Sequence, residues 1–142
     1  MDDHELLCTF LAHRVDPAVF SHRDHVRVAW LLIERFPLEN ALQRFEAGAR
    51  DLATRAGVPE KYHVTITRAL MQIIAADQAR GAGQSCAEYC ASNPPVLQDA
   101  LSVLLRHYSK DRIFSDAART TWCEPDLVPL PIPTAAPVLR SA

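Results

Sequence analysis

The chain is poor in glycine and has no excess of basic residues. Four of its 142 residues are glycine, and 15 lysines and arginines stand against 17 aspartates and glutamates, which makes the formal net charge -2 at pH 7. A protein that binds nucleic acid presents a basic face to the phosphates, so this balance argues against nucleic acid as the main partner. The sequence also lacks a Lys/Arg-rich amphipathic segment, which argues against binding to a membrane surface.

Long hydrophobic runs and a dense cysteine pattern are missing as well. No apolar stretch approaches the roughly 20 residues that a membrane-spanning helix needs. The first five residues, MDDHE, lack the basic start and apolar core of a secretory signal peptide. The four cysteines are scattered and form no C-x-x-C motif. From these features we expect reduced thiols and a cytoplasmic location.

Helix-forming residues, by contrast, fill long stretches of the chain. No segment with alternating apolar and polar residues, bounded by hairpin turns, predicts a sheet. The sequence therefore predicts an all-α fold, with a single helical domain over residues 1–124 built from a bundle of four main helices plus short helices. The main helices are expected over residues 3–14, 21–36, 38–56 and 62–80. Further helices are expected over residues 85–91, 96–107 and 115–121.

The C-terminal segment is rich in proline. Prolines stand at positions 125, 129, 131, 133 and 137, and proline interrupts a helix because it lacks the backbone N–H and clashes with the preceding turn. Residues 125–142 are therefore predicted to be a proline-rich extended tail, either laid along the domain or disordered.

Three histidines lie at the starts of predicted helices. His22 and His25 are three residues apart, so their side chains share one side of the second helix. His63 opens the fourth helix and continues its apolar row. Short connections make successive helices antiparallel, so the second and fourth helices should run in the same direction and begin at the same end of the bundle. We therefore expect these three imidazoles to meet at one pole.

Three neutral imidazoles with an open coordination position suit a divalent transition metal, either Zn, Fe, Cu or Ni. The predicted metal ligands are His22, His25 and His63, with Asp24, Glu60 or His107 as alternates. This interpretation leads to a metal-dependent enzyme acting on a small polar or anionic metabolite, of the lyase, isomerase or oxygen-using class. Proton transfer would fall to Glu60, Tyr62 or Tyr108. Substrate binding would fall to Thr67 and to Arg27 or Arg112, because a guanidinium binds a carboxylate through two hydrogen bonds.

Two other functions are consistent with the same residues. The pole can belong to a non-enzymatic domain that binds a small ligand or senses a metal. Alternatively, the histidines are structural and the chain is a helical adaptor, since a single histidine beside an apolar stripe is more often a core or cap residue. Apolar residues outside the main stripes, among them Leu31, Leu32 and Val103, suggest a homodimer as a further hypothesis.

Four segments resemble those of a family of small, all-α bacterial proteins of unassigned function. They are HRDHVRVAW at residues 22–30, EKYHVTIT at residues 60–67, HYS at residues 107–109 and PDL at residues 125–127. The resemblance covers about residues 20–130 and includes the spacings HRDHxRxAW and EKYHxTxT. It implies that these segments belong together in one protein type, and it carries no activity.

Overall fold

The computed structural model describes residues 1–81 and 83–133, and it confirms the all-α fold. The four longest helices are α1 (Asp3–Leu11), α2 (His22–Arg35), α3 (Leu38–Arg55) and α4 (Val64–Arg80). A 3-10 turn, η1 (Pro59–Lys61), precedes α4. Short helices follow: α5 (Cys86–Ala91), α6 (Pro95–Gln98), α7 (Ala100–Leu104), α8 (Lys110–Ile113) and α9 (Asp116–Thr120). No helix within the described ranges is long and apolar enough to cross a membrane.

Side-chain caps determine where several helices begin. The Ser21 hydroxyl accepts from the backbone N–H of Asp24, and the Asp24 carboxylate accepts from the backbone N–H of Ser21. The same reciprocal cap opens α1 and α5. Such a cap satisfies two N–H groups that have no partner inside the helix. This explains why the start of α2 lies within one residue of the position expected from Ser21.

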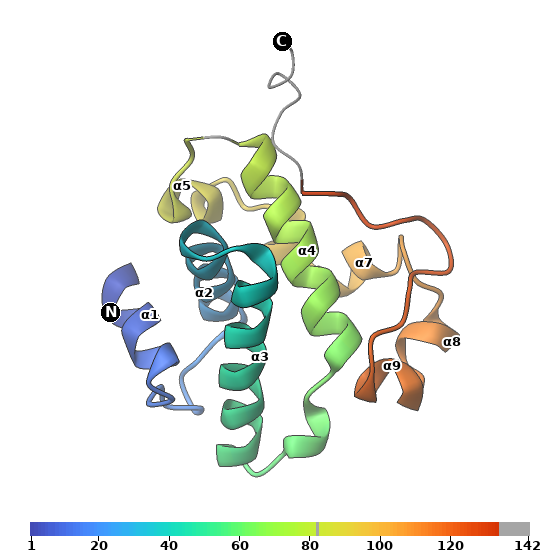
Figure 1. Cartoon of the computed structure of the whole chain (residues 1–142), viewed down its shortest axis with the longest axis horizontal. Helices are drawn as coiled ribbons and strands as arrows, with labels where there is room; N and C mark the ends of the chain where they lie inside the picture. The colour runs from blue at the N-terminus through green and yellow to red at the C-terminus, as the bar shows by residue number, and fades with distance from the viewer. Residues whose placement is uncertain (82, 134–142) are drawn as a thin grey trace.

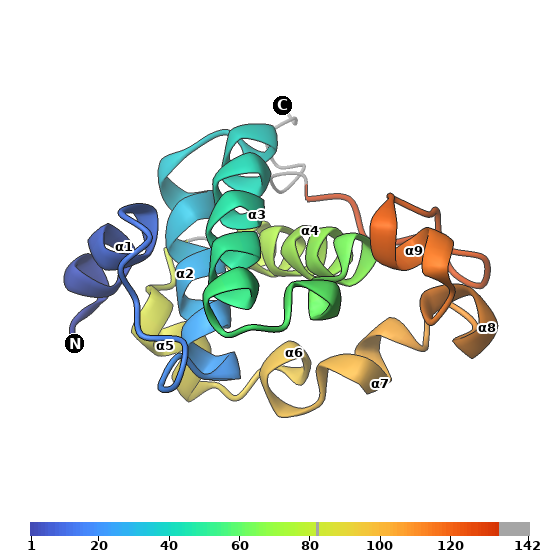
Figure 2. The same ribbon diagram turned by 90° about the horizontal axis from the view of Figure 1, so that it is seen from below.

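α2 lies at the centre of the fold and contacts α1, α3, α4, α5 and α6. Figure 2 shows α2 and α3 side by side, with α4 running across them. The largest fully buried side chains come from several of these elements and include Phe10, Trp30, Leu32, Met71, Leu104 and Tyr108. α4 crosses the α2–α3 pair (Figure 2), and the first turns of α2 and α4 line the same cleft.

A close contact between α1 and α3 depends on Gly48. A Cβ atom at this position would lie 2.3 Å from Cζ of Phe10. The Phe10 ring is buried, with its centroid 5.8 Å from that of Phe20 and 5.6 Å from that of Phe45. Glycine at position 48 therefore permits this aromatic cluster to pack against the backbone of α3.

The single helix expected over residues 96–107 is two short helices. The chain breaks at Asp99, whose backbone is extended, with φ -157° and ψ 82°. The Asp99 carboxylate accepts from the backbone N–H of Ser102 at 3.1 Å and from its hydroxyl at 2.7 Å. Aspartate side chains compete with the helical backbone in this way, so they favour a helix start over a helix interior. The turn α8 was not predicted, and it begins at the cap residue Ser109.

Residues 121–133 form a C-terminal strap that is anchored on α4. The hydroxyl of Thr65, a residue with no exposed surface, donates to the backbone oxygen of Thr121 at 2.8 Å and accepts from the backbone N–H of Cys123 at 3.0 Å. Further along α4, the Gln72 amide donates to the backbone oxygen of Pro131 at 3.0 Å. Figure 1 shows the strap returning from α9 to α4. Residues 125–133 of the predicted tail therefore lie along the domain, and residues 134–142 fall outside the described residues.

Candidate functional site

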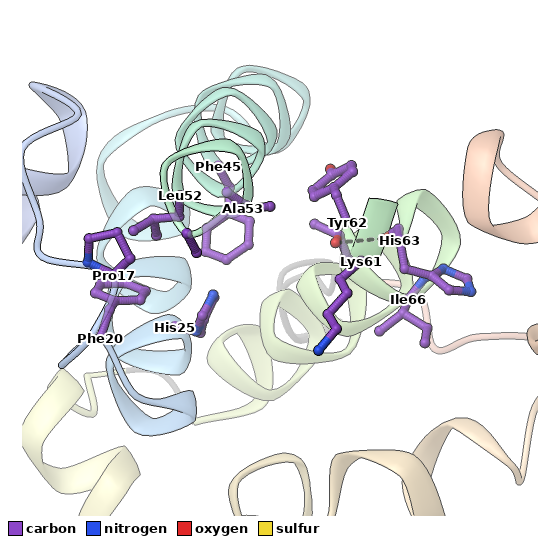
Figure 3. A pocket seen from close by; sticks show the side chains of 13 residues that line it. Pro17, Phe20, His25, Phe45, Leu52, Ala53, Lys61, Tyr62, His63 and Ile66 are labelled. Carbon is purple, nitrogen blue, oxygen red and sulfur yellow. Dashed lines mark hydrogen bonds between the residues drawn. The ribbon is translucent and has the colours of Figure 1, made fainter. Parts of the chain in front are cut away.

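A cleft of about 390 Å³ opens between the start of α2, the C-terminal half of α3 and the start of α4 (Figure 3). A smaller inner cavity of about 190 Å³ adjoins it and extends between α2 and α4. Both spaces are lined by His25, Phe45, Ile66 and Thr67. α3 and α4 separate toward η1, the turn that precedes α4, and this separation leaves the space open (Figure 1).

The walls of the cleft are mainly apolar. α3 contributes Phe45 and Leu52 together with the small side chains of Ala49 and Ala53. Phe20, from the loop before α2, closes one end. The inner cavity adds Val26, Ala29, Leu70, Met71 and Ile74. Small-molecule sites are concave and largely apolar, with a few polar groups that orient the ligand, and this cleft has that composition.

His25 is one of two polar side chains at the junction of the two spaces, together with Thr67. Its ring lies edge-on to the rings of Phe20 and Phe45, with centroid distances of 4.6 and 6.0 Å. Nδ1 lies 3.1 Å from the backbone oxygen of Ser21, and a carbonyl oxygen only accepts, so Nδ1 carries the proton. Burial lowers the pKa of this imidazole below its ordinary value. His25 is therefore a neutral imidazole whose Nε2 is an acceptor.

His63 also lines the cleft, and both of its ring nitrogens bond backbone groups. It is the N-cap of α4, and its Nδ1 accepts from the backbone N–H of Ile66 at 3.1 Å. Its Nε2 donates to the backbone oxygen of Ile113 at 2.7 Å. Figure 3 shows the ring turned away from His25. Both ring nitrogens are used, so neither offers a free lone pair to a metal.

His22 is exposed at the first position of α2, and its Nε2 donates to the backbone oxygen of Val96 at 2.8 Å. It lines the inner cavity together with His25. Across residues 1–81 and 83–133, no three His, Cys, Asp or Glu side chains are grouped so that they could hold a metal ion. The structure brings His25 and His63 to the cleft, and His22 and His25 to the inner cavity. The three rings do not form a metal-holding group in these residues, and the metal site stays a prediction from the sequence.

Tyr62 is buried at the cleft and belongs to a charged network on α3 and α4. Its hydroxyl donates to the Glu46 carboxylate at 3.3 Å, and the Arg50 guanidinium lies 4.4 Å from the centre of its ring. Burial, together with the negative charge of Glu46, raises the pKa of Tyr62 to about 12. The phenol therefore keeps its proton at neutral pH. The neighbouring Thr67 also lines the cleft, and its hydroxyl donates to the backbone oxygen of His63 at 2.7 Å.

Arg27 and Glu60 lie outside the cleft. The Arg27 guanidinium forms an ion pair with Asp3 at 2.8 Å, which attaches α2 to α1, and a second pair with Asp24 at 3.2 Å within α2. Glu60 is exposed in η1, and its backbone oxygen accepts from the Arg119 guanidinium at 3.3 Å. The structure therefore brings neither the predicted substrate-binding arginine nor the predicted acid to the site, because both charges face other elements or water.

Tyr108 and Arg112 position the strap and do not reach the cleft. Tyr108 has no exposed surface, and its hydroxyl donates to the backbone oxygen of Cys123 at 2.7 Å. Arg112 donates from Nε to the backbone oxygen of Glu124 at 2.5 Å. The alternate ligand His107 contacts the backbone oxygen of Val128 through Nδ1 at 2.9 Å. These side chains satisfy backbone carbonyls of an extended segment, which lie outside any helix and need partners from elsewhere.

The cleft residues that the sequence did not single out are mostly small or aromatic. Phe45, Ala49 and Leu52 are buried on the inward face of α3. Lys61 is exposed at the mouth of the cleft. No sequence signal distinguishes an apolar residue that contacts a neighbouring helix from one that lines a cleft, because both lie on the same helix face.

The partly buried imidazoles of His25 and His63 make stability depend on pH. Burial lowers the pKa of His25, and burial with the nearby Arg119 guanidinium lowers the pKa of His63. In the unfolded chain a histidine titrates near pH 6.5, so below that pH the unfolded state binds more protons than the folded state. We expect the free energy of unfolding to be highest well above about pH 6.5, the ordinary pKa of histidine, and to decrease as the pH falls through and below that value.

Urea unfolding at a series of pH values measures this effect, in a window above the range where carboxylates titrate. The double variant His25→Phe with His63→Asn is the control, and its profile should be flatter than that of the wild type. A free energy of unfolding that stays constant or increases on acidification would contradict the neutral state of these rings.

Comparisons of the chain with protein-family models, curated proteins and solved structures produced no match. The function of the chain is therefore inferred from the geometry of the site.

Proposed function

We propose that this chain is a ligand-binding domain that takes a small, mainly apolar organic molecule into the cleft between α2, α3 and α4. The observation that carries the proposal is the polar junction at His25 inside an apolar space. The imidazole stands where the cleft of about 390 Å³ adjoins the inner cavity of about 190 Å³, so a ligand that enters either space contacts it.

Burial of the ligand would supply most of the binding free energy. Apolar surface removed from water contributes about 25 cal/mol per Å². Phe20, Phe45 and Ile66 surround the space with side chains that offer such contacts. The polar groups at the cleft would then orient the ligand, since an unpaired polar group in an apolar site costs free energy.

A substitution that fills the cleft tests the proposal. Ala53 faces the cleft from α3, and Ala53→Trp places an indole in the space that the ligand would occupy. We expect this variant to bind the neutral fluorophore N-phenylnaphthylamine at least about tenfold more weakly than the wild type, because a filled site removes more than 1.4 kcal/mol of contacts. Fluorescence titration measures the dissociation constant, and the wild type should saturate with one site.

Ala117→Trp is the matched control, because it makes the same change at an exposed helical position in α9. This variant should bind the fluorophore as the wild type does. Equal weakening in both variants, or fluorescence that never saturates in the wild type, would place binding on a general surface and remove the proposed site.

A further inference from the structure

The polar side chains that line the cleft share a chemical property. Apart from lysine, each side-chain donor hydrogen is already used inside the protein. His25 donates to the backbone oxygen of Ser21, Tyr62 donates to Glu46, and Thr67 donates to the backbone oxygen of His63.

The other two imidazoles follow the same rule. His22, which lines the inner cavity, donates through Nε2 to the backbone oxygen of Val96. His63 donates through Nε2 to the backbone oxygen of Ile113. A neutral imidazole has one N–H donor and one acceptor, so each of these donations consumes the only donor of its ring.

The capacity that remains is for accepting hydrogen bonds. In the described ranges, Nε2 of His25 has no hydrogen-bond partner, and the oxygens of Thr67 and Tyr62 keep lone pairs. Lys61 is the exception among these side chains, and it is exposed at the mouth of the cleft. The side chains of the interior therefore offer a ligand acceptors in place of donors.

We infer that the cleft selects a neutral molecule that carries one hydroxyl donor on an apolar body, such as an aromatic alcohol, and that Nε2 of His25 accepts the hydroxyl hydrogen. This inference rests on the proposed binding function and names the class of ligand. An ether of the same shape has no hydrogen to donate, so its binding would leave the imidazole nitrogen unpaired in an apolar space.

A carboxylate fits the interior less well than a hydroxyl. An ionised carboxyl group only accepts hydrogen bonds, so it would face the lone pair of Nε2. Protonation of the imidazole would remove this conflict, and burial between the two phenylalanines opposes protonation. The ammonium of Lys61 can attract an anion to the mouth, where water screens the interaction.

Three probes of similar shape test the inference at neutral pH: naphthol, methoxynaphthalene and naphthoate. Calorimetric or competitive fluorescence titration of the full chain measures their dissociation constants. We expect naphthol to bind the wild type at least about tenfold more tightly than methoxynaphthalene, the ratio expected for one hydrogen bond in an apolar site. In His25→Phe the preference should fall to near unity, because phenylalanine keeps the aromatic contacts and has no acceptor.

Equal affinity of the wild type for naphthol and methoxynaphthalene would overturn the inference while leaving the binding function intact. Tighter binding of naphthoate than of naphthol would also overturn it. Failure of all three probes to bind, together with N-phenylnaphthylamine, would reject the binding function itself. If His25→Phe does not fold, His25→Gln is used in its place. The glutamine amide oxygen can accept a hydrogen bond, so this variant should keep part of the preference for naphthol. The comparison of naphthol with methoxynaphthalene on the wild type still decides the inference.

Discussion

His63→Ala is expected to lower the free energy of unfolding by about 3 kcal/mol. The change removes the N-cap of α4, which is worth about 1 kcal/mol, and it leaves the buried backbone oxygen of Ile113 without a donor, which costs about 1–3 kcal/mol. In a chain of this length such a loss corresponds to a decrease in Tm of roughly 10 °C. Urea unfolding, with the thermal midpoint as a second readout, measures the effect.

His63→Asn separates the two contributions. An asparagine at the N-cap can still accept from the N–H of Ile66, but its side chain is too short to reach the oxygen of Ile113. We expect it to lose clearly less stability than His63→Ala. Both losses should be the same with and without a chelator, because the imidazole acts through backbone groups. A His63→Ala protein as stable as the wild type, or one destabilised only when metal is present beforehand, would contradict the anchoring role.

Gly48→Ala is expected to destabilise the fold by about 2 kcal/mol, although alanine is the better helix former by about 1 kcal/mol. The new Cβ would lie 2.3 Å from Cζ of Phe10, a ring enclosed by Phe20 and Phe45, so the ring must move against its neighbours. Overpacking of a core costs about 1–3 kcal/mol, and a contact this close with an enclosed ring belongs at the upper end of that range, so the cost exceeds the gain in helix propensity. Phe20 and Phe45 also contact His25, so the displacement should weaken ligand binding as well.

Gly81→Ala is the control for this prediction. A Cβ at that position would meet the end of the Gln84 side chain, which can move away at little cost. Adding Phe10→Leu to Gly48→Ala should restore part of the lost stability, since the smaller side chain vacates the contested space. A double-mutant cycle measures this coupling. If the two substitutions are simply additive, the close contact between position 48 and the ring does not limit stability.

The helices could be predicted well from the sequence because local chemistry determines them. Ser21 with Asp24 marks the start of α2, Pro37 ends it, and the glycine at position 57 follows α3. Asp99 was placed inside a helix, although its side chain caps the next one. Apolar periodicity shows which face of a helix is buried. It does not show that the helix breaks at position 99, because the break depends on whether the Asp99 carboxylate bonds a nearby backbone N–H.

The candidate site was predictable only in part. His25 was identified from its place at the start of the second helix, and the structure places it in the cleft. The direction in which α4 crosses its neighbours was not predictable, because many packing angles satisfy the same apolar stripe. The partner of His63 lies 50 residues further along the chain, at Ile113. Arg112 and Tyr108 resemble site residues in the sequence, and they satisfy carbonyl groups of the strap instead.

The anchor at Thr65 has a consequence for how the protein opens and closes. The Thr65 hydroxyl bonds two backbone groups that lie 56 and 58 residues further along the chain. His63 bonds Ile113, which lies 50 residues further along. Such distant pairs form only after the intervening chain has closed a long loop, so they contribute to contact order and belong late in folding. The amides of α8, α9 and the strap should therefore exchange with solvent as one cooperative unit, at lower free energy than those of α2 and α3.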